Sequence, residues 1–86
     1  MQGQLSAALS KDDLLQRRST TTQLLDTAEQ KLKALTRTLS TDEKAVMQNI
    51  RTYIRQARSA IDTGDVERAY NLALKAQLLS DELAKR

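Results

Sequence analysis

Basic residues recur at helical spacing in the middle of the chain, at Lys44, Arg51, Arg55 and Arg58. Neither Arg51 nor Arg55 has an acidic residue three or four positions away, so pairing along a single helix does not neutralise them. Three guanidinium groups within about 10 Å of helix could hold phosphate or carboxylate groups. We therefore treat Arg51, Arg55 and Arg58 as a candidate anion-binding stripe. The alternative is a solvated face, or pairing with acidic residues of another helix.

Pairs of adjacent carboxylates are candidates for acid–base chemistry. They occur at Asp12/Asp13, Asp42/Glu43 and Asp81/Glu82. The first two pairs stand at predicted helix starts, where the helix dipole stabilises negative charge, and we expect the third pair to be solvated. The sequence has no histidine, no cysteine, no phosphate loop and no zinc-ligand spacing. We therefore expect a non-enzymatic protein with no catalytic residues, metal, cofactor or small-molecule substrate.

A turn at Gly64 organises the elements that position these groups. A glycine after an apolar-periodic run is typical of the left-handed end of a helix, and Asp65 can cap the helix that follows. Apolar residues recur at steps of three and four on both sides, from Val46 to Ile61 and from Val66 to Leu83. The spacing predicts two antiparallel helices joined by a short loop, an αα-hairpin.

The composition favours an all-α fold, because aromatic residues make up only 2% of the 86 residues and proline is absent. Ser40 and Glu43 form a capping-box pattern that marks a second boundary. We predict a single-domain antiparallel three-helix bundle, with helices over residues 11–39, 41–62 and 65–85 and a flexible N-terminal segment at residues 1–10. Ser19 and the three threonines after it weaken the first helix by roughly 2 kcal/mol without breaking it.

The two helices of the hairpin are each about 21 residues long, and an equal length of the first helix is enough to pack against them. The start of the first helix, Lys11–Arg18, then extends beyond the hairpin end by roughly two turns. Leu14 and Leu15 lie on this N-terminal overhang with nothing opposite them. An exposed apolar pair is a candidate self-association or partner-docking site. The alternatives are that the helix bends at the threonines and tucks the pair over the hairpin end, or that an upstream segment covers it.

Residues around the turn have the sequence spacing expected where two helices pack closely. They are Tyr53, Ala57, Gly64, Asp65, Ala69, Ala73 and Ala76. These spacings resemble one tetratricopeptide repeat, although Asp81 stands where the repeat has proline and no second copy follows. Small residues at a tight crossing of two helices account for the same pattern.

The run Gly64–Leu83, with Ile50, Arg51 and Gln56 before it, resembles the C-terminal helical domain of small uncharacterised bacterial envelope or lipoprotein-like proteins. That resemblance implies a periplasmic or cell-envelope location. It supplies no activity, no cofactor and no site residues.

We expect the chain to act as a helical protein-interaction or spacer domain, through a protein partner or self-association. One alternative is an anion-binding module whose arginine stripe meets an acidic polymer, lipid headgroups or nucleic acid; another is an engineered helical scaffold or binder. We expect no nucleic-acid partner, because the net charge is only +3 and no aromatic stacking platform is present. No apolar run is long enough to span a bilayer, so we expect membrane attachment only through an upstream anchor.

Overall fold

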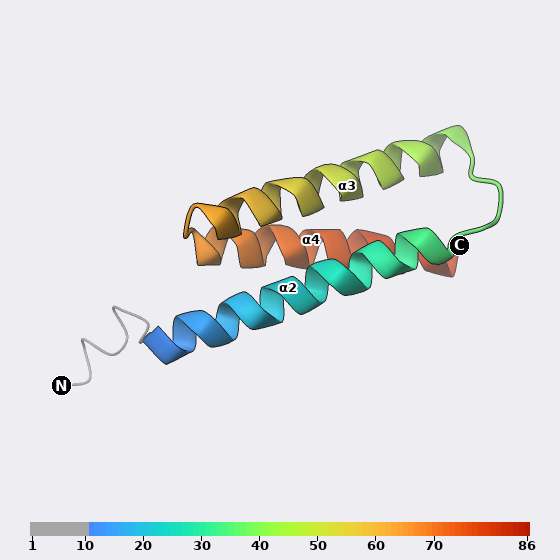
Figure 1. Cartoon of the computed structure of the whole chain (residues 1–86). Coiled ribbons are helices and arrows are strands. Elements are labelled where there is room, and N and C mark those ends of the chain that lie inside the picture. The colour runs from blue at the N-terminus through green and yellow to red at the C-terminus, as the bar shows by residue number, and fades with distance from the viewer. Residues whose placement is uncertain (1–10) are drawn as a thin grey trace.

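The computed structural model describes residues 11–86, and the flexible segment expected at residues 1–10 lies outside the described residues. Over residues 11–86 the chain forms three α-helices and no strand: α2 (Lys11–Ala34), α3 (Thr41–Asp62) and α4 (Val66–Lys85). Consecutive helices run in opposite directions (Figure 1). The prediction of an all-α, antiparallel three-helix bundle is confirmed.

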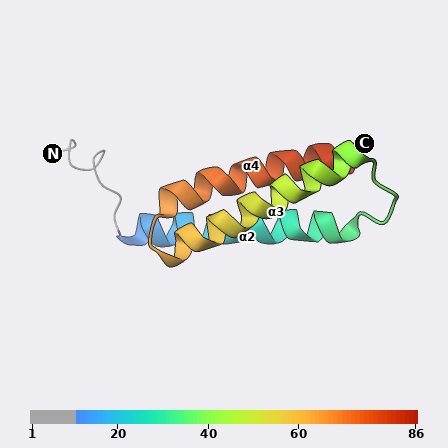
Figure 2. The same ribbon diagram turned by 90° about the horizontal axis from the view of Figure 1, so that it is seen from above.

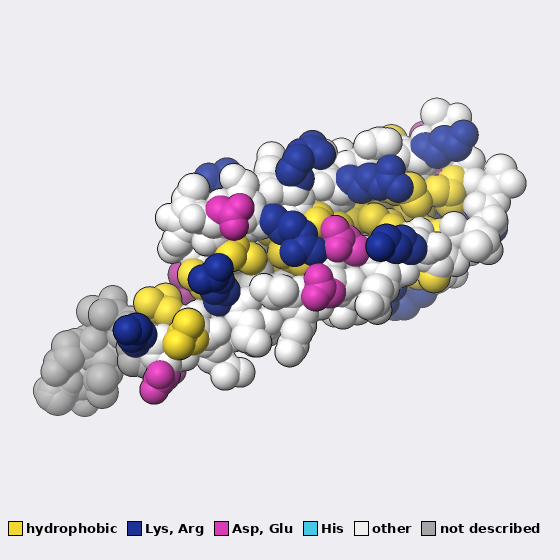
Figure 3. Space-filling model, in the orientation of Figure 1, with side chains coloured by type: hydrophobic (Ala, Val, Ile, Leu, Met, Phe, Trp, Pro, Cys, Tyr) yellow, Lys and Arg dark blue, Asp and Glu magenta, His cyan; other side chains and the backbone are white. Residues whose placement is uncertain are grey.

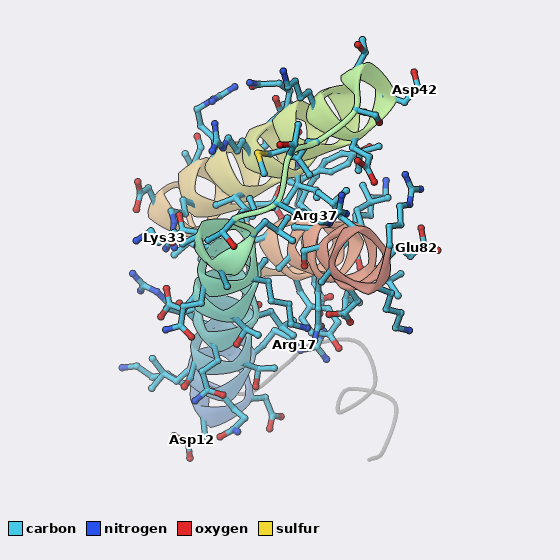
Figure 4. The ribbon with its side chains drawn as sticks, turned by 90° about the vertical axis from the view of Figure 1, so that its right-hand side faces the viewer. Asp12, Arg17, Lys33, Arg37, Asp42 and Glu82 are labelled. Atoms are coloured by element: carbon cyan, nitrogen blue, oxygen red, sulfur yellow. The ribbon has the colours of Figure 1, made fainter. Side chains whose placement is uncertain are left out.

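The last helix is the centre of the packing. α4 packs extensively against both α2 and α3, whereas α2 and α3 contact each other only sparingly. Four small residues of α4 are fully or almost fully buried, which lets both neighbours approach closely: Ala69, Ala73, Ala76 and Ser80. The core cluster joins Ala73 and Ala76 to apolar residues of the other helices, including Leu25, Leu32, Ile50 and Ile54. In the view of Figure 4, α2 and α4 lie next to each other and α3 crosses obliquely above them.

Two ion pairs join α2 to α4. Arg17 pairs with Glu67 at 3.2 Å, and Lys31 pairs with Asp81. Both pairs join residues that are 50 positions apart, so the two helices run parallel in one constant register. Arg17 also lies 4.2 Å from the centre of the Tyr70 ring, a cation–π contact.

The turn at Gly64 has the hydrogen bonds of a Schellman motif. The Gly64 N–H donates to the Ile61 carbonyl at 3.0 Å, and the Asp65 N–H donates to the Ala60 carbonyl at 2.8 Å. Gly64 has a φ of +85°, in the left-handed region that suits glycine. The Asp65 carboxylate then accepts from the Arg68 N–H at 3.2 Å. The predicted glycine stop and aspartate cap are both confirmed.

The loop between α2 and α3 is fastened at the opposite end of the bundle. Ser40 and Glu43 form the predicted capping box, with bonds of 3.1 and 2.9 Å between each side chain and the other's backbone N–H. Arg37 donates to both Glu43 carboxylate oxygens and to the Leu83 carbonyl of α4. The hydrogen bonds from Arg37, and then the one from the Ser40 N–H, lower the pKa of Glu43 to about 2. Figure 4 shows Arg37 beside the end of α4.

The first helix ends at Ala34, so the predicted end at residue 39 is wrong. Its last turn tightens, because the Leu35 N–H donates to the Leu32 carbonyl at 3.2 Å. The prediction extended the helix to residue 39 because Leu35 and Leu39 continue its apolar spacing. Both are instead half-buried in the loop, which must cross from α2 to α3.

The threonine run does not interrupt α2. The Thr21 hydroxyl donates to the Arg17 carbonyl at 2.7 Å, and the Thr22 hydroxyl donates to the Arg18 carbonyl at 3.0 Å. These hydroxyls are therefore satisfied within the helix. The helix is continuous from Lys11 to Ala34 as predicted, and its first turns do not fold back over the α3–α4 turn (Figure 1).

The N-terminal end of α2 extends beyond the α3–α4 turn (Figures 1 and 2). The overhang is shorter than the predicted Lys11–Arg18, because Arg17 already contacts Tyr70 and Glu67 of α4. All residues of Lys11–Gln16 are exposed, and from here on the overhang means this segment.

Candidate functional site

A groove of about 450 Å³ lies between α2 and α3. It follows from the packing of the bundle, because α4 holds both helices while the two contact each other little. Residues from both helices line it: Glu29, Leu32 and Lys33 from α2, and Arg51, Ile54, Arg55 and Arg58 from α3. The structure thus places all three arginines of the predicted stripe along one groove. Lys44, at the start of the same predicted stripe, is exposed and does not line it.

The floor of the groove is apolar and its rim is cationic. Leu32 and Ile54 form the floor with 7% and 5% of their surface exposed, so the floor is the outer surface of the core. Figure 3 shows hydrophobic side chains along the seam between the two helices, with Lys and Arg side chains on either side. Figure 4 shows Lys33 on the side of α2 turned away from α4. The groove therefore offers apolar contact and positive charge together.

Arg58 bridges the two walls at the end of the groove nearer the α3–α4 turn. Its guanidinium donates to Asp26 at 3.2 Å and to Glu29 at 2.8 Å, both on α2. Burial lowers the pKa of Arg58, but the hydrogen bonds to the two carboxylates outweigh it and raise the pKa above the ordinary value. The charge of Arg58 is thus neutralised by carboxylates of α2. This is the interhelical pairing that the sequence analysis gave as an alternative to anion binding.

Arg51 and Arg55 differ from Arg58. Both are exposed, and Arg55 makes one long hydrogen bond, 3.4 Å, to the Thr52 hydroxyl of its own helix. In the described residues 11–86, no ion pair engages Arg51, Arg55 or Lys33. These three cations therefore keep their charge available to a ligand that lies in the groove.

The second predicted site is separate from the groove within one chain. Leu14 and Leu15 on the overhang are 39% and 57% exposed, and Leu78 on α4 is the third large apolar side chain that the described chain leaves exposed. Of the third acidic pair, Glu82 is exposed as expected, whereas Asp81 is half-buried and pairs with Lys31 of α2. The other two acidic pairs lie at helix starts. Asp12 and Asp13 lie in the first turn of α2, Asp42 and Glu43 in that of α3.

Sequence reasoning missed the polar residues that α2 contributes: Glu29 and Lys33 line the groove, and Asp26 pairs with Arg58. The available signal is their spacing of three and four, which places them on one face of α2. That face lies opposite Arg58 only because of the register between α2 and α3. Periodicity gives the face of a helix and not its register against a neighbour, so no sequence pattern assigns this pairing.

Within residues 11–86, no cluster of acidic side chains is suited to hold a metal ion. None of the three described helices is both long and apolar enough to cross a bilayer.

No protein family, curated protein or solved structure was found to match this chain. The resemblance to envelope proteins, and the location that it implies, therefore stay predictions.

Proposed function

We propose that this chain is a protein-interaction domain that binds a helical segment in the groove between α2 and α3. The observation that supports the proposal is the pairing of an apolar floor with three cations, Lys33, Arg51 and Arg55, that have no ion pair within residues 11–86. Helix-in-groove recognition uses this combination, in which an apolar stripe supplies contact area and flanking charges select the partner.

The shape of the bundle favours a helix as the occupant. Two helices that are held apart by a third present a long shallow channel, and a fourth helix in that channel completes a four-helix arrangement. The charge of the rim selects acidic residues beside the apolar stripe of the bound segment, because carboxylates form charge-assisted hydrogen bonds with guanidinium groups. The expected partner is an amphipathic helix with Leu or Ala on one face and Glu or Asp along its edges.

Two synthetic peptides of about 18 residues test the proposal by fluorescence anisotropy. Both carry leucine at helical spacing; one has glutamate at the flanking positions and the other has lysine. We expect the glutamate peptide to bind and the lysine peptide to fail. Reversing two rim charges with Arg51→Glu and Arg55→Glu should weaken binding of the glutamate peptide by at least about tenfold, because repulsion replaces attraction.

The matched control reverses two charges elsewhere, with Arg68→Glu and Lys85→Glu on α4. It changes the net charge of the chain equally and leaves the groove intact, so affinity for the glutamate peptide should change little. Equal losses in the two variants would show only a general charge effect. Binding of neither peptide at millimolar concentration would end the proposal.

A second candidate function is binding of an anionic polymer by the same cations, since Arg51, Arg55 and Lys33 suit phosphate as well as carboxylate. Inorganic polyphosphate, titrated at several salt concentrations, is the probe. Steeply salt-dependent binding that is lost with Arg51→Glu and Arg55→Glu favours this candidate if a glutamate peptide without leucine also binds. A requirement for leucine favours the helix-binding proposal.

A further inference from the structure

We infer that the segment bound in the groove is the N-terminal end of α2 from a second copy of this chain. Two copies then form a closed dimer in which each overhang lies in the groove of the other. The inference rests on the proposed function, because it names the partner of the same groove. It joins two exposed surfaces of the described residues, the overhang and the groove, into one interface.

The overhang has the chemistry that the groove selects. Leu14 and Leu15 present apolar side chains that are 39% and 57% exposed, and Asp12 adds an exposed carboxylate one turn before Leu15. A leucine suits the apolar floor of Leu32 and Ile54, and the Asp12 carboxylate suits the cationic rim. Figure 3 shows hydrophobic side chains at the N-terminal end of α2 on the same face of the molecule as the seam between α2 and α3.

The face of α2 that carries Leu15 is complementary to itself. Helical spacing places Leu15, Arg18, Glu29 and Lys33 on one face. When two such helices run antiparallel with Leu15 of one copy over Leu32 and Lys33 of the other, Arg18 lies next to Glu29 of the other copy. An ionised carboxylate accepts several hydrogen bonds, so Glu29 can accept from Arg18 while it keeps its bond to Arg58.

The arrangement closes on itself. A two-fold axis through the middle of this face repeats each contact, so both overhangs and both grooves are used and no further copy is added. The interface involves about 27 Å of α2 and part of α3, which is small for a protein dimer. We therefore expect a weak dimer, with a dissociation constant on the order of 10 µM.

Sedimentation velocity between about 10 µM and 1 mM protein measures this equilibrium. We expect a monomer–dimer transition in the wild-type chain. Leu15→Lys should raise the dissociation constant at least about tenfold, because it buries a charge on the apolar floor and places that charge beside the cationic rim. The matched control is Leu78→Lys, the same change at the most exposed leucine of α4, which is 66% exposed and outside the interface. It should leave the dissociation constant unchanged, and circular dichroism should show equal helix content in both variants.

A disulfide test identifies the mode of docking, since the chain has no cysteine of its own. In a chain with Leu15→Cys and Lys33→Cys, the two sulfurs lie about 27 Å apart along one helix and cannot bond within a copy. We expect oxidation to give a covalent dimer in high yield. The control chain with Leu15→Cys and Leu78→Cys should give little dimer.

The outcomes separate this inference from the proposed function. A wild-type chain that is monomeric at about 1 mM, or equal weakening by Leu15→Lys and Leu78→Lys, overturns the dimer. If the glutamate peptide still binds in the groove of that monomer, the proposed function stands with a different partner. If neither a second copy nor the peptide binds, both are wrong.

Discussion

Gly64 has the most demanding backbone conformation of the described residues, since it alone has positive φ, at +85°. A Cβ atom added there would meet no atom within 4 Å, so any cost of substitution comes from the backbone conformation and not from a neighbour. We expect Gly64→Ala to lower the free energy of unfolding by about 1 kcal/mol, the usual cost of holding a Cβ in the left-handed region. Urea denaturation followed by circular dichroism measures it.

Gly64→Asn is the matched control, because asparagine tolerates the left-handed region better than alanine does. Its loss in the free energy of unfolding should be clearly smaller. If Gly64→Ala is as stable as the wild type, the turn reaches another conformation and the Schellman geometry is not required.

At the residue scale, the sequence located the arginines of the groove but not their different roles. The lack of acids beside Arg51 and Arg55 was visible, and both remain without an ion pair within residues 11–86. Arg58 has an acid at i+4, Asp62, yet it pairs with Asp26 and Glu29 of α2. Such partners depend on the distance between helices, which no local pattern contains.

At the element scale, α2 shows how a polar residue can continue an apolar face. The regular spacing of leucines is interrupted before Leu25 by the threonine run. From that run we predicted a segment of lower helix stability. In the structure Thr21 is fully buried and continues the line of Leu25, Ala28 and Leu32 at steps of four and three. Its hydroxyl is satisfied by the Arg17 carbonyl, which leaves its methyl group to pack in the interior.

Thr21→Val should therefore raise the free energy of unfolding, by about 0.5 kcal/mol, because it keeps the shape and removes a buried hydroxyl. The Arg17 carbonyl keeps its helical hydrogen bond, so no buried polar group is left without a partner. Equilibrium denaturation in urea measures the change.

Thr22→Val is the neighbouring control. Thr22 is half-buried and makes the same type of bond, to the Arg18 carbonyl, so its substitution should change stability less. A loss of more than about 1 kcal/mol in Thr21→Val would mean that the hydroxyl has a structural role beyond its bond within the helix.

At the scale of the whole molecule, Arg37 and Glu43 join the loop, α3 and the last turn of α4. The pKa of Glu43 in the folded chain is about 2, below its ordinary value of 4.5. A lowered pKa stabilises the fold above pH 4.5, and that stabilisation is lost as the pH falls from 4.5 to 2. We expect the urea midpoint to fall over this range and Glu43→Gln to reduce the fall.

Glu82→Gln is the control for this pH dependence, because it removes a carboxylate from the outer side of α4, where Figure 4 shows Glu82. It should retain the wild-type fall between pH 4.5 and 2. If Glu43→Gln and Glu82→Gln behave alike, the acid sensitivity comes from general charge and not from the contact between Arg37 and Glu43.

The architecture was predictable from periodicity and caps, because Gly64, Asp65 and the pair Ser40 and Glu43 mark where two of the helices begin or end. The open edge between α2 and α3 was not predictable. It depends on how the helices pack, with α4 against both neighbours and little contact between α2 and α3. The groove is thus a property of how the three amphipathic helices are arranged. Which residues line it can be stated only once that arrangement is known.

The central place of α4 also bears on biosynthesis. A ribosome makes α2 first, α3 second and α4 last, yet the first two helices share few contacts until the third arrives. Most of the stability of a helix in a protein comes from tertiary packing of its apolar face, so we expect a nascent chain that has emerged only as far as Asp62 to lack a stable fold. Folding would then wait for α4 to leave the exit tunnel, and the apolar faces of α2 and α3 would stay open to chaperones until that moment.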